Sequence, residues 1–238
     1  MPERYDCSRR ELTELPEELR GMTDVRELYV YDNQLRALPD WLGELTELRV
    51  IDANRNRLES LPPSIGRLPN LYYLYIAEQR LTELPDTIAG LETLAYLNAS
   101  HNGLTTLPPT IGEMSSLVEL RLDDNALTEL PEGLRRLTKL RELHLTSNQI
   151  RELPPWIADL FSLRRISLRN NKVTALPPEI ATLQHLRDLD LRGNNLRDLP
   201  ASITEIRSLE RLDLRWNPIA GNPTWLSVLE RHGCTIWR

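Results

Sequence analysis

Residues 186–199 read LRDLDLRGNNLRDL, in which the leucines and one asparagine follow the spacing LxxLxLxxNxLxxL. Pro200 and Ile203 continue this pattern as LPxxI, and the pattern returns at every step of 23 residues towards the N-terminus. One position carries an amide side chain in each unit: Asn33, Asn56, Gln79, Asn102, Asn125, Asn148, Asn171, Asn194 and Asn217. Another position carries proline: Pro16, Pro39, Pro62, Pro85, Pro108, Pro131, Pro154, Pro177, Pro200 and Pro223. Because the register never drifts, we interpret the whole chain as one array of repeats.

The letters of one unit predict its local structure. Leu189 and Leu191 alternate with polar residues, which indicates a short strand with one buried face. Strands that recur at a constant interval should stack in parallel, roughly 4.8 Å apart. The buried Asn amide can bond backbone groups of its own turn and of the next. Proline has no N–H, so the return segment should be a short 3₁₀ or helical turn rather than a second sheet. Returns are wider than strands, so the stack should curve with its strands inside.

We therefore predict an α/β repeat fold, a right-handed solenoid with a parallel concave sheet and short 3₁₀ or helical convex segments. We interpret residues 1–238 as a single domain made of four parts: a degenerate N-terminal unit (1–24), eight full repeats (25–208), a partial repeat (209–221) and a C-terminal capping helix and strand (222–238). Asn222 is expected to cap that helix, with Pro223 in its first turn and Gly233 at its end. Arg10 stands where Asn belongs, so the amide ladder should end there.

Composition and charge limit the possible functions. The net charge of −6 argues against binding to nucleic acid or to a membrane surface. No apolar run follows residues 1–5 and no stretch reaches membrane-spanning length, so we expect neither a signal peptide nor membrane insertion. Cys7 and Cys234 lie about nine strand spacings apart, on the order of 45 Å, which is too far for a disulfide. Two buried thiols favour a cytoplasmic location, and a secreted effector without a signal peptide would look the same.

The 23-residue LPxxI unit, as it stands at residues 186–217, resembles that of cytoplasmic leucine-rich repeat proteins of the Ras-pathway scaffold type. It is also similar to plant intracellular Ras-group-related repeat proteins, Scribble-type scaffolds and bacterial leucine-rich repeat proteins. The resemblance covers nearly the whole chain, but the matching residues are structural ones. It implies protein–protein recognition on the concave face and identifies no partner.

The residues expected on the concave face do not repeat from unit to unit, whereas the core does. All seven tyrosines lie within the first 96 residues, and five occupy concave positions: Tyr29, Tyr31, Tyr73, Tyr75 and Tyr96. Tyrosine is enriched in binding hot spots, although strands also favour aromatic residues. Asn98 and Arg121 continue the column of Tyr75, and His101 lies near Tyr96. We include these three residues in the candidate partner-binding site.

The amide ladder has one irregular position within the full repeats. The repeat that begins at Leu71 carries Gln79 where the others carry Asn. The longer side chain is expected to shift the turn, which would mark this tyrosine-rich repeat as the contact site. Neutral drift is the alternative, since Gln keeps the amide chemistry.

The second half of the concave face carries charges. Arginine occupies one concave position in three successive repeats, at Arg169, Arg192 and Arg215, and Trp216 follows the last of them. Asp190 and Asp213 occupy the adjacent column. This arrangement fits a docking stripe for an acidic partner segment, with Trp216 as an aromatic anchor. It fits equally well a charge ladder that satisfies itself.

No motif in the sequence predicts catalysis. The patterns GxSxG, HExxH, CxxC and a phosphate-binding glycine loop do not occur, so we expect neither an enzyme nor a cofactor. The four histidines are too widely spaced for a metal site. We predict a monomeric protein-interaction module, a scaffold or signalling adaptor, that binds a protein partner on its concave face. The alternatives are a substrate-recognition subunit of a ubiquitin ligase or phosphatase, and a glycan or small-molecule binder.

Overall fold

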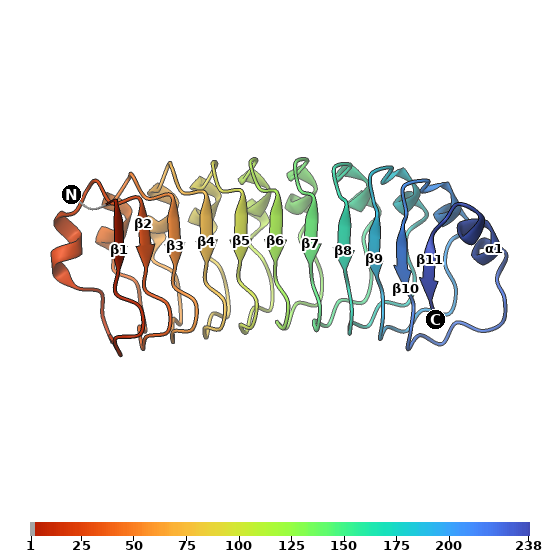
Figure 1. Cartoon of the computed structure of the whole chain (residues 1–238), viewed down its shortest axis with the longest axis horizontal. Coiled ribbons are helices and arrows are strands. Elements are labelled where there is room, and N and C mark those ends of the chain that lie inside the picture. Colours follow the sequence, from red (N-terminus) through yellow and green to blue (C-terminus); the bar gives the residue numbers. More distant parts are fainter. Residues whose placement is uncertain (1–2) are drawn as a thin grey trace.

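The computed structural model describes residues 3–238, which form one parallel sheet of eleven strands in chain order (Figure 1). Met1 and Pro2, which belong to the predicted N-terminal unit, lie outside the described residues. The strands are β1 (Arg4–Asp6), β2 (Glu27–Tyr29), β3 (Val50–Asp52), β4 (Tyr73–Tyr75), β5 (Tyr96–Asn98), β6 (Glu119–Arg121), β7 (Glu142–His144), β8 (Arg165–Ser167), β9 (Asp188–Asp190), β10 (Arg211–Asp213) and β11 (Thr235–Trp237). The predicted fold class is confirmed.

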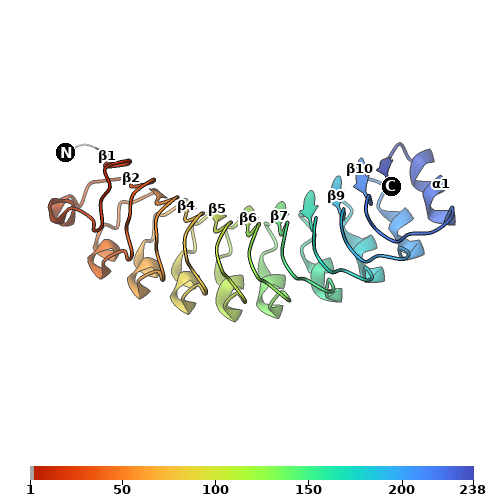
Figure 2. The same cartoon turned by 90° about the horizontal axis from the view of Figure 1, so that it is seen from below.

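The return segments are short 3₁₀ helices on the outer side of the curve, and the strands line the inner side (Figure 2). Within residues 3–238 they are η1 (Glu17–Gly21), η2 (Asp40–Glu44), η3 (Pro63–Arg67), η4 (Asp86–Gly90), η5 (Pro109–Glu113), η6 (Glu132–Arg136), η7 (Pro155–Asp159), η8 (Pro178–Thr182) and η9 (Ala201–Glu205). The ladder proline precedes each of them; Pro154, for example, lies before η7 with φ −70° and ψ 153°. Its fixed φ turns the chain out of the strand direction and starts the return.

The core lies between the sheet and the returns and runs the length of the array. The middle residue of a strand points into it, so Leu74 and Leu143 are completely buried. The returns add a second buried layer, to which Ile88 and Ile157 belong. Complete burial of one such side chain stabilises the fold by about 1.5–3 kcal/mol relative to exposure. The same contacts recur in every repeat, which explains why the strand register is uninterrupted.

The amide ladder ties each repeat to the one before it. Asn148 Nδ2 donates to the carbonyl of Leu145 in its own turn and to that of Leu122 in the preceding repeat, while its Oδ1 accepts from the N–H of Leu127. The predicted bond to the following repeat is therefore wrong, because the amide bonds to the preceding repeat instead. The residue before each amide has a positive φ, as in Ser147 (55°), which aims the amide into the core.

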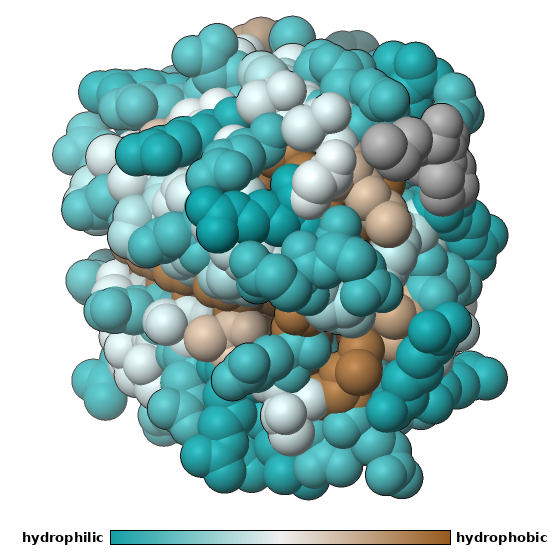
Figure 3. Space-filling view, turned by 90° about the vertical axis from the view of Figure 1, so that its left-hand side faces the viewer, coloured by the Kyte–Doolittle hydropathy of each residue, from teal (hydrophilic) through white to brown (hydrophobic). Residues whose placement is uncertain are grey.

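The two ends of the array are closed differently. At the N-terminal end, Tyr5, Leu12 and Met22 are only partly buried, and apolar side chains are visible between polar ones (Figure 3). At the C-terminal end, helix α1 (Thr224–Arg231) buries Trp225 and Leu229 against the last repeat. The Trp225 indole N–H donates to Asp198 Oδ1 over 2.8 Å. Strand β11 then pairs with β10 and extends the sheet by one strand.

The start of α1 differs from the sequence prediction. Pro223 occupies the N-cap position and Thr224 is the first helical residue, so Asn222 does not cap the helix. The Asn222 amide oxygen instead accepts a hydrogen bond from Arg238. Gly233 follows the helix with φ 87°, a conformation that favours glycine.

Cys7 and Cys234 are both buried, and neither forms a disulfide. Within residues 3–238, no helix combines the length and apolar character that a membrane crossing requires.

Candidate functional site

The open face of the sheet is built from the first and third residues of each strand, because the second points into the core. Parallel pairing in register places equivalent positions side by side: Tyr73 pairs with Tyr96, and Asp190 pairs with Asp213. The columns read from the sequence are therefore physical rows across neighbouring strands. Side chains of the same column on neighbouring strands can contact each other across the roughly 4.8 Å between strands.

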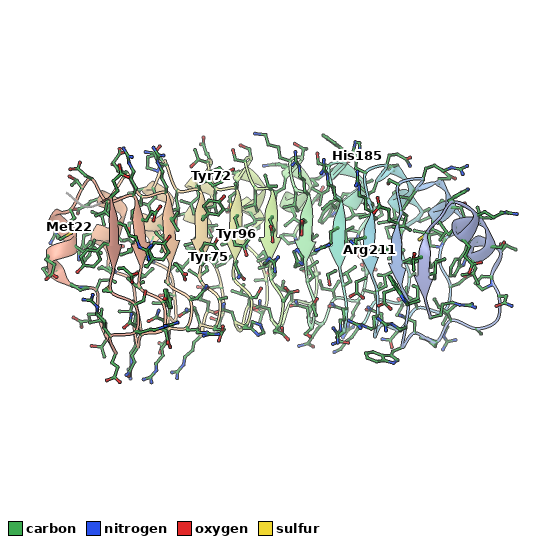
Figure 4. All side chains as sticks on the ribbon, in the orientation of Figure 1. Met22, Tyr72, Tyr75, Tyr96, His185 and Arg211 are labelled. Carbon is green, nitrogen blue, oxygen red and sulfur yellow. The ribbon has the colours of Figure 1, made fainter. Side chains whose placement is uncertain are left out.

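Four tyrosines gather at β4 and β5, with Tyr72 just before β4, and we call them the tyrosine cluster: Tyr72, Tyr73, Tyr75 and Tyr96. Figure 4 labels Tyr72, Tyr75 and Tyr96. The ring centroids of Tyr75 and Tyr96 lie 4.9 Å apart, and those of Tyr72 and Tyr73 lie 4.8 Å apart. Tyr72 and Tyr73 keep 46% and 39% of their surface exposed. Burial raises the pKa of Tyr75 and of Tyr96, so their hydroxyls remain protonated donors at neutral pH.

A hollow of about 510 Å³ adjoins the cluster where β3 and β4 begin. Tyr72, Tyr73, Arg49 and Val50 contribute to its walls. Among the described residues, no carboxylate lies within 4.0 Å of the Arg49 guanidinium, whereas the neighbouring Arg26 is paired with Glu3. The hollow therefore offers aromatic surface next to an arginine without a close carboxylate, although Glu3 and Glu27 also line it.

Tyr29 and Tyr31 were predicted as part of the same surface, but the structure keeps them apart from the cluster. The Arg4 guanidinium lies 4.3 Å from the ring centroid of Tyr29, whose hydroxyl donates to Glu27. Arg9 lies 5.3 Å from the ring centroid of Tyr31. Strand β3, which carries no tyrosine, separates these two residues from β4. Their rings are already used in contacts within the protein.

The centre of the face is a network of charged groups. Arg121 Nε donates to Glu119, and Arg165 lies 3.7 Å from Glu142. The Nε2 atom of His144, which is buried, lies 3.1 Å from Oε2 of Glu142. One ligand atom each from Glu119, Glu142 and His144 lies within 4.8 Å of the others. Because an arginine approaches each carboxylate, we interpret the group as an ion-pair network.

Asn98 and His101 contribute less to this surface than their positions suggest. The Asn98 amide oxygen accepts a hydrogen bond from the backbone N–H of Ser100, 3.1 Å away, and so closes a local turn. His101 adopts φ 54° in the turn before the ladder amide, and its ring lies 3.5 Å from Asp124. Both side chains have partners inside the chain.

The three stripe arginines differ in their partners. Arg215 is held by Asp213 through Nε at 3.0 Å and through a second guanidinium nitrogen. Burial opposes ionisation of Asp213, but its hydrogen bonds from Arg215 hold its pKa below the ordinary value. Arg192 approaches Asp190 only to 3.8 Å, and its guanidinium carbon lies 5.5 Å from the ring centroid of Trp216. The stripe is therefore paired closely at Arg215 and loosely at Arg192, and no carboxylate lies within 4.0 Å of Arg169 among the described residues.

A model of leucine-rich repeat regions matches residues 59–156 and 154–235. The chain belongs to the leucine-rich repeat family. A comparison with curated proteins finds no significant match.

Solved structures of other leucine-rich repeat proteins share the fold. The ectodomain of the receptor kinase GASSHO1/SCHENGEN3 from Arabidopsis thaliana, in complex with CASPARIAN STRIP INTEGRITY FACTOR 2, is 29% identical with a TM-score of 0.77. The functional domain of InlJ from Listeria monocytogenes is 25% identical with a TM-score of 0.80. Each alignment covers 94% of this chain, but only 31% of the receptor chain and 47% of the InlJ chain. The internalin InlF, also from Listeria monocytogenes, is 22% identical with a TM-score of 0.78 over 94% of this chain and 70% of its own.

The expected shift at Gln79 is absent from this leucine-rich repeat array. Gln79 Nε2 donates to the carbonyls of Ala53 and Ala77, and its Oε1 accepts from the N–H of Leu58. The residue before it has φ 57°, the value found in the other turns. Only the bond to the carbonyl three residues earlier, which Asn148 makes to Leu145, has no counterpart here. The longer side chain thus fits the same turn with one fewer hydrogen bond.

Sequence analysis missed several residues of this leucine-rich repeat face. Arg49 lines the hollow from the position before β3, where the alternation of strand residues gave no reason to place it on the surface. The group of Glu119, Glu142 and His144 was overlooked because only distances between histidines were considered. Its two glutamates stand in one column of the sequence pattern, which is the signal that could have found it.

Proposed function

We propose that this leucine-rich repeat protein is a protein-interaction module that binds a protein partner on its concave face. The tyrosine cluster carries the proposal. Tyr72 and Tyr73 expose large rings on a rigid sheet, and tyrosine gives contact area at little cost in side-chain entropy. The Arabidopsis receptor ectodomain, whose structure is a complex with CASPARIAN STRIP INTEGRITY FACTOR 2, supports a binding role for the fold.

We further propose that the protein acts as a cytoplasmic scaffold or signalling adaptor, and that it works as a monomer. The 23-residue LPxxI unit, which resembles that of Ras-pathway scaffold-like, plant intracellular and bacterial repeat proteins, supports the scaffold role. The buried, unlinked thiols of Cys7 and Cys234 support a reducing compartment.

The test is affinity capture from a lysate of the source cells, followed by calorimetry with the captured protein. Tyr73→Ala and Tyr75→Ala should each weaken binding by about 2 kcal/mol, as expected for hot-spot residues. Tyr31→Ala is the matched control, because this ring lies outside the cluster against Arg9. Full affinity in both cluster variants would place the contact elsewhere. Recovery of a catalytic ligase or phosphatase subunit would favour the role of substrate-recognition subunit.

A glycan is the second candidate ligand, and the hollow beside the cluster favours it. Aromatic rings at Tyr72 and Tyr73 next to the unpaired Arg49 could stack and hydrogen-bond a sugar in about 510 Å³. A glycan array separates the two functions. Binding of defined glycans that Tyr72→Ala abolishes, with no protein captured, would support the glycan function.

A further inference from the structure

Two of the stripe arginines have buried donors without partners. The Nε atoms of Arg169 and Arg192 are shielded from solvent, and neither forms a hydrogen bond in the part of the chain that the structure describes. Arg169 has no carboxylate within 4.0 Å among residues 3–238, and Arg192 approaches Asp190 only to 3.8 Å. Arg215, one strand further, is fully engaged by Asp213. The difference sets Arg169 and Arg192 apart from the other charges of the face.

An unpartnered buried donor is unusual because it loses its bonds to water and gains none in return. A guanidinium also presents its donors in a planar fork that matches a carboxylate with two parallel hydrogen bonds. Arg169 and Arg192 occupy equivalent positions two residues after β8 and β9, so their backbones lie roughly one strand spacing apart, about 4.8 Å. The pair is arranged to receive an oxyanion from outside the chain.

Trp216 adds a second, independent observation at the same place. It is 69% exposed, the highest value among the large apolar residues. Its φ of 61° puts it in the left-handed turn position that Ser147 and Asn170 occupy in earlier repeats. A bulky residue gains nothing there from packing in the fold, and its ring instead covers the guanidinium of Arg192.

Gly193 lies close to the preceding turn. It occupies the same turn position between Asn170 and Trp216, also with positive φ, and a Cβ there would come within 2.6 Å of the Asn170 side-chain oxygen. Glycine at this position lets the two turns pack closely. The Arg192 side chain keeps 17% of its surface exposed, although its Nε is shielded from solvent.

We propose that Arg169, Arg192 and Trp216 form a subsite that binds the carboxylates of an acidic segment of the protein partner, with Trp216 covering one side of it. The local charge pattern favours discrete carboxylates over a long polyanion. Asp188, Asp190 and Asp213 alternate with the arginines, and the whole chain carries −6, so a nucleic acid would meet repulsion on both sides.

The subsite deepens the proposed function because its position suits a partner already held by the tyrosine cluster. β5 and β9 are separated by four strand spacings, roughly 19 Å. An extended segment of about six residues spans that distance. One segment of a partner could therefore place an aromatic or apolar residue on the cluster and a carboxylate on the subsite.

The test uses the full chain, labelled with nitrogen-15, and two short peptides, hexaglutamate and hexaglutamine. Hexaglutamate should shift the Nε–H resonances of Arg169 and Arg192 saturably, and hexaglutamine should not. The Arg215 resonance serves as the internal reference, since Asp213 already holds that side chain. Arg169→Gln and Arg192→Gln should each weaken hexaglutamate binding about tenfold, the effect of losing one charge-assisted contact. Arg187→Gln, at an exposed arginine before β9, should leave it unchanged.

Several outcomes would overturn the subsite. No shift at millimolar hexaglutamate would do so, as would equal shifts at all arginines, which indicate only screening. If inorganic phosphate bound as tightly as hexaglutamate, the subsite would be a phosphate site rather than a carboxylate site. If the Gln variants unfold, Arg169→Lys replaces them, because it keeps the positive charge. It should still weaken hexaglutamate binding, since lysine lacks the planar guanidinium fork.

The outcome is separable from that of the proposed function. Tyr73→Ala should retain full hexaglutamate binding, since Tyr73 lies on β4 and the subsite residues follow β8, β9 and β10. If Tyr73→Ala loses the partner but still binds hexaglutamate, the subsite is unaffected by that loss. If Arg169→Gln and Arg192→Gln capture the partner normally, the subsite is not a partner contact.

Discussion

The two halves of the concave face share one frame and differ in their chemistry. On β4 and β5 the open positions carry tyrosines whose rings contact one another. On β8 to β10 and just after them the open positions carry arginine and aspartate, some paired closely and some only loosely. The residues beneath them are alike, and Leu74 and Leu189 are both completely buried. Stability is thus encoded on the buried side of each strand and recognition on the open side, and the two can change independently.

The largest expected effect comes from the C-terminal end, because it supports the charged half more than the aromatic half. Deleting residues 222–238 removes α1 and β11 and exposes Leu212, Leu214 and the last return. Exposed apolar ends of a solenoid aggregate, and unfolding should spread from that end. Hydrogen exchange should show protection lost at β10 and β9 first, with β4 and β5 protected longest. A soluble monomer with an unchanged melt would show that the two halves do not depend on this end.

The next effect tests whether the frame is the same in both halves. Asn56 donates to Val30 and Ala53, and Asn171 donates to Leu145 and Leu168, over 2.8–3.0 Å. Replacing either Asn by Ala leaves buried carbonyls unpaired and should cost about 1–3 kcal/mol. The two costs should agree within error.

Urea unfolding of both variants gives the measurement, and Thr128→Ala is the control. Thr128 is exposed and its side chain makes no hydrogen bond within residues 3–238, so its replacement should cost less than about 0.5 kcal/mol. Clearly unequal costs for the two Asn variants would mean that the halves differ in their frame as well as their face.

A smaller effect is expected at the irregular ladder position under the tyrosine cluster. Gln79→Asn should restore the missing bond to the carbonyl of Ile76, which Asn102 and Asn125 make in their own turns to Ala99 and Leu122. One such bond contributes about 0.5–1.5 kcal/mol, so the variant should be more stable by that amount. Urea unfolding measures the gain. Unchanged partner affinity would assign Gln79 to drift, and weaker binding would show that it shapes the cluster.

The smallest effect separates two aspartates of the charged half by their pH dependence. Burial raises the pKa of Asp190 in the folded protein, so its ionised form destabilises the fold above that pKa, and the penalty disappears as the pH falls. Asp213 has the opposite sign. Although burial opposes it, hydrogen bonding by Arg215 lowers its pKa, so its stabilisation is present above the unfolded value and is lost as the pH falls through the folded one.

Thermal melts from pH 3 to pH 7 test this contrast. Asp190→Asn should match or exceed the wild type at pH 7, and Asp213→Asn should be less stable there. The Asp213→Asn difference should shrink as the pH falls below about 3.9, the ordinary carboxyl value. Parallel curves for the two variants would remove the distinction between the loosely paired Asp190 and the closely paired Asp213.

The repeated core and the amide ladder could be predicted from the sequence because they recur in every unit. The leucines, the ladder amides and the prolines recur at one interval, and each has a single physical role that its neighbours confirm. The left-handed turn before each amide could not be predicted, because the residues at this position share no residue type. Asp32, Glu78 and Trp216 are examples. Only Gly193 gave a local signal for that conformation.

The face was less predictable because its side chains choose between partners. Tyr29 and Tyr75 stand in the same column, yet Arg4 covers the first and Tyr96 contacts the second. Arg192 and Arg215 also share a column, and only Arg215 forms close hydrogen bonds with an aspartate. Such differences depend on side-chain conformation across strands, which a pattern along one strand does not contain.

The constant interval of 23 residues has a consequence for how such a chain can change in length. Every repeat bonds to its neighbour through the same atoms, as Asn56 does to Val30 and Asn171 to Leu145. A duplication or loss of one whole 23-residue unit between β6 and β9 would therefore bring together repeat surfaces that already fit each other. Such an event would move the tyrosine cluster and the arginine subsite apart or together by one strand spacing, about 4.8 Å. The length of partner segment that reaches both sites would change in steps of roughly one to two residues.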